Sequence, residues 1–126
     1  MLYDKESIYT GDELLGPAVT PDVLEKAEGW LYVLAARLGV DKEEIQPSFL
    51  VQTLVAAYAY REVGYLKSGG AGRGAFTADE GEDYYGRKLA YYERRIKEIE
   101  HQITAADMTG HKAGAPGYRA VEIFRG

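Results

Sequence analysis

The stretch from residue 83 to residue 103, DYYGRKLAYYERRIKEIEHQI, decides what kind of fold this chain adopts. Its apolar side chains recur at spacings of 4, 3, 4, 3 and 4, at Tyr85, Leu89, Tyr92, Ile96, Ile99 and Ile103. This spacing is the heptad seam of a long amphipathic helix. Because Thr77 and Glu80 have capping-box spacing, the sequence predicts a helix over 78–105, roughly 40 Å long at 1.5 Å per residue. The seam is expected to close the domain's own core.

Another helix is predicted upstream, from residue 21 to residue 38, and it is the first in chain order. Thr20 is a good N-cap, and Pro21 occupies the first helical position, where its missing N–H costs nothing. Apolar residues then follow at helical spacing as far as Leu38, and Gly39 provides the C-terminal stop. These signals predict an amphipathic helix that buries one face.

Between these two lies another predicted helix, the second in chain order, which begins near Pro47-Ser48 and ends at about Leu66 or Lys67. No residue between Phe49 and Tyr60 is charged, and the segment is apolar over more than half its circumference. A helix of this kind usually has neighbours on several sides. We therefore expect it to be central.

The remaining segments predict less regular structure. Residues 1–19 are expected to form an irregular arm, with one possible helical turn between Thr10 and Pro17, that docks through Leu2, Ile8, Leu14 and Leu15. Four glycines in residues 69–74 predict a loop. The end of the chain, Tyr118–Arg125, is typical of a single extended strand that needs a partner for its backbone groups.

Taken together, these patterns predict one all-α domain spanning residues 1–126. The expected architecture is a three-helix bundle with a long third helix, an irregular N-terminal arm (1–19), a helical core (20–105) and an extended C-terminal tail or strand (106–126). A chain of 126 residues can bury roughly two-thirds of its unfolded surface, which suffices for a packed core.

Composition narrows the class of protein. There are 15 Lys plus Arg against 20 Asp plus Glu, and the net charge of −5 argues against wholesale nucleic-acid binding. The chain has no cysteine, which excludes disulfides, thiolate metal sites and cysteine nucleophiles. It has no apolar run of membrane-spanning length and no secretory signal, so we expect it to stay inside the cell unless an assembly carries it out.

No motif in the chain predicts catalysis. His101 and His111 are the only histidines, and no second ligand stands at metal-binding spacing. The glycine loop around Arg73 lacks the Gly-Lys-Ser/Thr of a phosphate-binding loop and follows a helix, not a strand. We therefore expect no catalytic residues, no metal and no cofactor.

Tyrosine is unusually frequent, with 11 Tyr against 3 Phe and 1 Trp. Tyrosine suits both half-buried core positions and interfaces between proteins, and both interpretations stay open. Tyr84 and Tyr91 lie seven apart, off the seam, on the predicted long helix. The predicted subunit or partner contacts are Arg73, Phe76, Tyr84, Tyr91, Tyr118, Val121, Ile123 and Phe124.

The order of these elements resembles the small head–tail connector (adaptor) proteins of tailed bacteriophages and prophages. The resemblance is carried by LVAAYAYRE at 54–62, by DYYGRKLAYYERRI at 83–96 and by the closing segment Tyr118–Gly126 with its final Phe-Arg-Gly. It covers roughly residues 20–105 and the tail. It rests on the pattern of elements, without a signature motif.

This resemblance implies a structural subunit without catalysis that multimerises into a ring between portal and tail. The implied partners are other copies of the chain, portal and tail or neck proteins, and DNA that passes through the lumen without sequence-specific binding. The implied location is the virion, assembled in the bacterial cytoplasm, with no membrane contact. The alternative is a small cytosolic helical module, such as a dimeric regulator, that binds a protein through the seam of its third helix.

Overall fold

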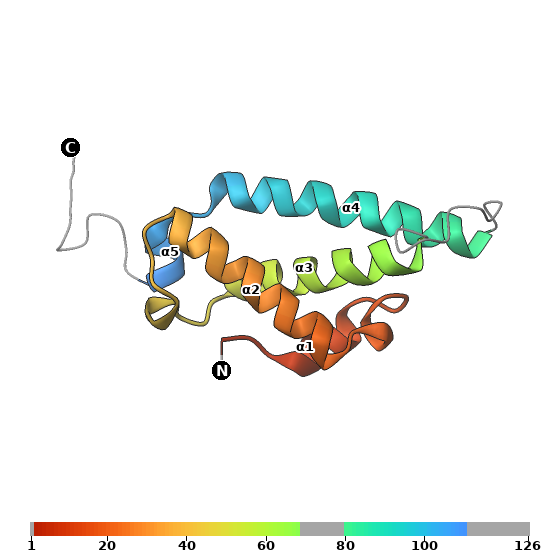
Figure 1. The fold of residues 1–126 in the computed structure, drawn as a ribbon, viewed down its shortest axis with the longest axis horizontal. Coiled ribbons are helices and arrows are strands. Elements are labelled where there is room, and N and C mark those ends of the chain that lie inside the picture. The colour runs from red at the N-terminus through yellow and green to blue at the C-terminus, as the bar shows by residue number, and fades with distance from the viewer. Residues whose placement is uncertain (1, 69–79, 111–126) are drawn as a thin grey trace.

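The structure is a computed structural model that describes residues 2–68 and 80–110, and within these ranges the chain is all-helical (Figure 1). Its elements, in chain order, are α1 (Lys5–Gly11), the 3-10 turn η1 (Gly16–Ala18), α2 (Pro21–Arg37), the 3-10 turn η2 (Lys42–Glu44), α3 (Phe49–Lys67), α4 (Glu80–Gln102) and α5 (Ala105–Thr109). The described residues thus form five α-helices where the sequence predicts three.

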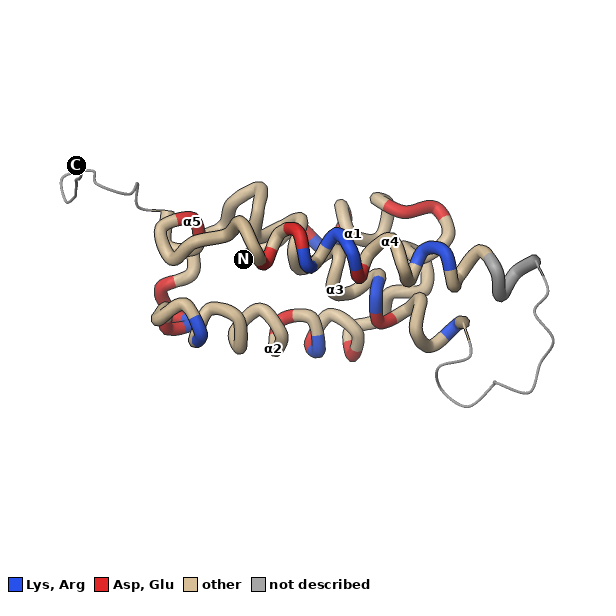
Figure 2. The backbone as a smooth tube through the Cα atoms, turned by 90° about the horizontal axis from the view of Figure 1, so that it is seen from above, with Lys and Arg blue, Asp and Glu red and all other residues tan. Residues whose placement is uncertain are grey.

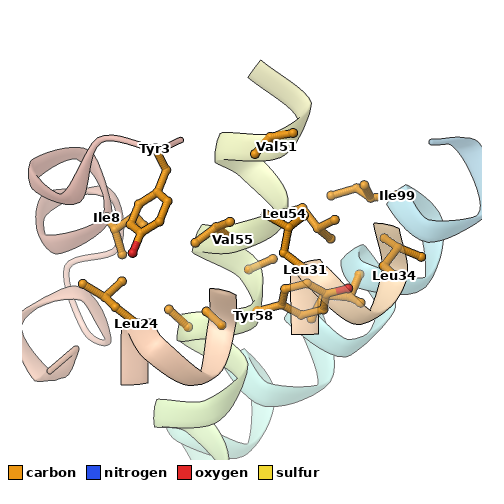
Figure 3. Close-up of a cluster of buried hydrophobic side chains, with 14 of the residues drawn as sticks. Tyr3, Ile8, Leu24, Leu31, Leu34, Val51, Leu54, Val55, Tyr58 and Ile99 are labelled. Atoms are coloured by element: carbon orange, nitrogen blue, oxygen red, sulfur yellow. The ribbon is translucent and has the colours of Figure 1, made fainter. Parts of the chain in front are cut away.

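The apolar helix α3 is central, as its composition predicts. It packs against α4 along one side and against α2 along another, and α5 also contacts it. Figure 3 shows the buried cluster that results, in which Val51, Leu54 and Val55 of α3 meet Leu31 of α2 and Ile99 of α4. All of these side chains are at most 2% exposed, so the core joins all three long helices.

Local signals set the ends of α2 and α3. The Thr20 hydroxyl accepts a hydrogen bond from the Val23 N–H at 3.2 Å, and the Ser48 hydroxyl accepts one from the Val51 N–H at 3.1 Å. Each bond satisfies a backbone donor that the first turn of a helix leaves free. Gly39, at φ +81°, ends α2 in the left-handed region that favours glycine.

The prediction of an irregular N-terminal arm is wrong. Residues Lys5–Gly11 form α1, which Asp4 caps by accepting from the Glu6 N–H at 3.1 Å. The expected turn between Thr10 and Pro17 is replaced by the end of α1 and by η1. The arm docks as predicted, because Ile8 and Leu15 are fully buried. Tertiary contacts described below hold this short helix in place.

The prediction of one helix to residue 105 followed by an extended tail is also wrong at residues 103–109. α4 ends at Gln102, and Thr104 starts α5 through a reciprocal capping box with Asp107. The Thr104 hydroxyl accepts from the Asp107 N–H at 3.1 Å, while the Asp107 carboxylate accepts from the Thr104 N–H at 2.9 Å. This local pair ends one helix and begins another, which the seam pattern alone does not reveal.

The short helix α5 returns the chain to the start of α3. The Gln46 N–H donates to the Met108 carbonyl at 2.7 Å, and Met108 is fully buried. Gly110 follows at φ +79° and lies beside the Gln46 side chain. The predicted strand Tyr118–Arg125 and the predicted cap at Thr77 lie outside the described residues. No helix in the described part of the chain has both the length and the apolar character to cross a membrane.

Candidate interaction surface

The inner face of α4 uses the predicted seam to close the core. Ile96, Ile99 and Ile103 are nearly inaccessible, and Tyr85 and Tyr92 pack partly buried against the same cluster. The helices approach closely at Gly64 of α3, where an added Cβ would lie 3.3 Å from the backbone Cα of Leu89. The seam is therefore occupied within the chain, and a partner of α4 has to use another face.

The outer face of α4 carries the two tyrosines that the sequence singles out. Tyr84 is 57% exposed and Tyr91 is 47% exposed. The guanidinium of Arg87 lies 5.6 Å from the Tyr84 ring centre, and that of Arg94 lies 5.9 Å from the Tyr91 ring centre. The same Tyr-x-x-Arg pair thus occurs twice, seven residues apart. Tyrosine and arginine are among the residue types that dominate binding energy at protein interfaces.

Beside this face runs a depression of about 410 Å³, which we call the α3 groove. Its floor is the small-residue side of α3, its walls come from α1 and α4, and it is lined by Ser7, Gly11, Phe49, Gln52, Thr53, Ala56, Ala57, Tyr60, Tyr91, Tyr92 and Arg95. Phe49 at one end is 80% exposed. Two large aromatic side chains thus remain open to solvent along one groove.

A buried carboxylate fixes the α1 wall to α4. Asp12 accepts from the Leu14 and Leu15 N–H groups at 3.0 and 2.8 Å, from the Tyr92 hydroxyl at 2.7 Å and from the Lys88 ammonium at 3.0 Å. Its side chain is 2% exposed. Burial alone would raise the pKa of the Asp12 carboxyl, but the bonds from Tyr92, Leu15 and Lys88 outweigh it and hold that pKa below its usual value.

The N-terminal segment is tied to α3 by further polar contacts. The Tyr60 hydroxyl donates to the Ile8 carbonyl at 2.6 Å. Gln52 bonds both backbone groups of Asp4, accepting from its N–H at 2.6 Å and donating to its carbonyl at 3.1 Å. The ring of Tyr60 also packs on that of Tyr92, with centres 5.0 Å apart. These bonds give the groove a fixed wall.

On the opposite side of α3, an aromatic and cationic stack joins α2 to α3 and α4. Arg61 lies 4.6 Å from the Trp30 ring centre and 5.2 Å from that of Tyr58. The Tyr58 hydroxyl donates to Glu100 at 2.6 Å, and burial, reinforced by this carboxylate, raises the pKa of Tyr58. Because the partners of these groups lie within the chain, the stack is a structural contact.

The structure places only two of the predicted contact residues. Tyr84 and Tyr91 are exposed on one helix, as a contact role requires. The others lie outside the described residues, namely Arg73, Phe76, Tyr118, Val121, Ile123 and Phe124. Sequence reasoning missed Phe49, since in a segment apolar on most sides nothing marks which side chain stays outside. It also missed Asp12, which has no distinguishing motif.

Of the two histidines, the structure describes only His101. His101 is exposed in the last turn of α4, beside Arg37 and Lys97, and His111 lies outside the described part. Within residues 2–68 and 80–110, no group of three or more His, Asp or Glu side chains is placed to hold a metal ion.

Comparison with known proteins adds no family to this description. No protein-family model, no curated protein and no solved structure matches the chain.

The buried tyrosines predict instability in alkali. Burial raises the pKa of Tyr60 to about 12, and burial together with a neighbouring carboxylate raises the pKa values of Tyr3, Tyr58 and Tyr92. Because these folded-state values exceed the unfolded value of 10.0, their stabilisation is fully present below pH 10 and is lost as the pH rises toward them. Urea unfolding at stepped pH should show this decline, and replacing Tyr92 with phenylalanine should make it shallower. A stability that stays constant up to about pH 12 would contradict the prediction.

Proposed function

We propose that this chain is a structural subunit of a phage or prophage head–tail connector, which multimerises into a ring between portal and tail. The observation that carries the proposal is the exposed Tyr–Arg face of α4. Tyr84 and Tyr91 are exposed to solvent, although the same helix buries Ile96, Ile99 and Ile103 of its apolar seam. Large exposed aromatics beside arginines are typical of surfaces that contact another protein.

In the assembled ring, we propose that this face and the tail contact neighbouring subunits. A repeated contact between unlike surfaces closes into a ring when its rotation permits. The segment Tyr118–Arg125 would add a strand to a neighbour, and the glycine loop with Arg73 and Phe76 would order on contact. This role requires the subunit neither to bind a small molecule nor to catalyse a reaction.

Substitutions on the Tyr–Arg face test the proposal. We expect Tyr84→Ser combined with Tyr91→Ser to abolish concentration-dependent oligomers while leaving the circular dichroism spectrum unchanged, because both side chains project from the fold. The matched control is Tyr65→Ser, since Tyr65 is also 47% exposed but lies on α3. Sedimentation velocity and negative-stain microscopy give the readout.

A second measurement separates a connector from other assemblies. The tagged chain, recovered from cells that carry its native genome, should bring down portal and tail or neck proteins, identified by mass spectrometry. The variant with both tyrosines replaced should lose them. A strict dimer that recovers no virion protein, and whose association survives deletion of residues 107–126, would favour the regulator instead.

A further inference from the structure

A second depression adjoins the α3 groove near the start of α3. This depression, lined by Leu2, Tyr3, Asp4, Lys5, Glu6, Pro47, Ser48 and Gln52, shares Gln52 with the groove. The two depressions meet at Gln52, whose side chain is bonded to the backbone of Asp4. Between Phe49 and Tyr60 the α3 groove is about 17 Å long, at 1.5 Å per residue. A groove of this length takes a single extended or helical segment.

Both ends of the α3 groove are aromatic and open. Phe49, at one end, is 80% exposed, and Tyr91, at the other end beside Tyr92 and Tyr60, is 47% exposed. The floor between them is formed by the small side chains of Thr53 and Ala56. Exposed aromatics at both ends of a groove with a smooth floor are features of a docking site.

The described chain ends next to this groove. Gly110 packs against Gln46, three residues before Phe49, and the Gln46 N–H is bonded to the Met108 carbonyl. Figure 2 shows that α5 lies toward the same side of the molecule as α1 and α4, and that α2 lies toward the other side. The described part of the chain therefore ends beside the Phe49 end of the groove, and residues 111–126, which lie outside it, follow from there.

We propose that the segment Tyr118–Arg125 of the same chain occupies the α3 groove in the isolated subunit. The connection from Gly110 to Tyr118 reaches at most about 28 Å, more than the groove is long. An eight-residue extended segment covers roughly 23 Å, enough to run from Phe49 to Tyr91. Tethering gives the segment a high effective concentration at this site, well above that of a separate copy.

The chemistry of the segment fits the lining in this direction. In an extended chain, alternate side chains point to opposite sides, so that Val121 and Ile123 face one wall and Tyr118 and Phe124 the other. Arg119 would lie at the end where Asp4, Lys5 and Glu6 line the second depression, two acids against one base, and Glu122 would lie on the side of Arg95. Glu122 would then face an opposite charge at Arg95.

This proposal goes beyond the connector role. It concerns the isolated subunit, in which the tail would lie over Phe49 and Tyr91, and this position does not depend on whether the chain assembles into a ring. Because only the position of the tail in the free subunit is at issue, its test leaves the ring proposal to be judged separately.

Photo-crosslinking of the full-length chain tests the position of the tail. A p-benzoylphenylalanine replaces Phe49 in one variant and Tyr91 in another, and isotopically light and heavy chains are mixed before irradiation. We expect cross-linked peptides that join either position to residues 118–125, both halves carrying the same label. The matched control places the photo-crosslinker at Val33, which is 58% exposed on α2, and should give none of these products.

A variant of the segment Tyr118–Arg125 controls for cross-links that arise from chance proximity. Replacing Val121 and Ile123 with aspartate should remove most of the cross-linked product, with an unchanged circular dichroism spectrum. Pairs of mixed label would show that a second copy fills the groove and would overturn the proposal. Products no more frequent from Phe49 or Tyr91 than from Val33 would overturn it as well.

Discussion

Replacing Asp12 with alanine will lower the free energy of unfolding by about 2–4 kcal/mol at neutral pH. The substitution removes the acceptor for the Leu14 and Leu15 N–H groups and leaves the Tyr92 hydroxyl without its partner. The ammonium of Lys88 can turn to water, because its side chain is 41% exposed, and this keeps the loss at a few kcal/mol. Urea unfolding measures the difference.

The matched control is Glu13→Ala, which removes an exposed carboxylate next to the buried one. It should change the stability by less than about 0.5 kcal/mol. Because Asp12 joins the N-terminal segment to α4, its loss should also raise the hydrogen exchange of the α1 amides more than that of α3. Equal effects of the two substitutions would show that the buried bonds contribute nothing.

The effect of Asp12 should depend on pH. Its folded-state pKa lies below the unfolded value of 3.8, so the carboxylate's contribution is present above that value and is lost as the pH falls through the folded-state pKa. The gap in stability between the natural chain and the alanine variant should therefore narrow in acid. The same urea series, repeated below pH 3.8, checks this.

Replacing Gly16 with alanine should also destabilise the chain, by about 2–3 kcal/mol. An added Cβ at this buried position would lie 2.3 Å from the Tyr9 carbonyl oxygen, a backbone atom that no rotamer change can move aside. The effect is steric and owes nothing to backbone conformation, since Gly16 is not among the glycines with positive φ. The turn η1 and the end of α1 would have to separate.

Gly29→Ala is the opposite case and serves as the control. Gly29 lies in the middle of α2, and an added Cβ there meets no atom within 4 Å. Alanine favours a helix over glycine, so this variant should gain up to about 1 kcal/mol. Thermal unfolding of both variants gives the comparison. A Gly16 variant as stable as the natural chain would mean that the N-terminal segment does not pack as closely as described.

The sequence predicts α2 and α3 well because their signals are local. Thr20, Pro21 and Gly39 mark the ends of α2, Ser48 marks the start of α3, and the structure uses each as expected. Such signals depend on neighbouring residues alone. The all-α class follows from them.

The N-terminal helix was not predictable in this way. A helix as short as α1 is marginal by itself, and it forms here because distant residues hold it. The Tyr60 hydroxyl and the Gln52 amide bind its backbone, and the Asp12 carboxylate fixes its end to α4. Bonds between residues so far apart in the chain leave no local pattern.

The candidate surface was predictable only in part, because one of its features is local and the other is not. Tyr84 and Tyr91 stand out because they fall seven apart and off a regular seam, so helical geometry alone places them outside. Which side chain of the apolar α3 stays exposed depends on where α1, α2 and α4 pack. Phe49 could therefore not be singled out before the helices were placed.

The bond between Tyr92 and Asp12 has a mechanical consequence. Tyr91 projects from α4, and the adjacent Tyr92 is bonded through Asp12 to the segment between α1 and η1. A force applied to the outer face of α4 therefore acts both on α4 and on the segment between α1 and η1, which is far from α4 in the sequence. Pulling on this helix should rupture the polar link and the apolar core in a single event, so that the domain gives way as one body.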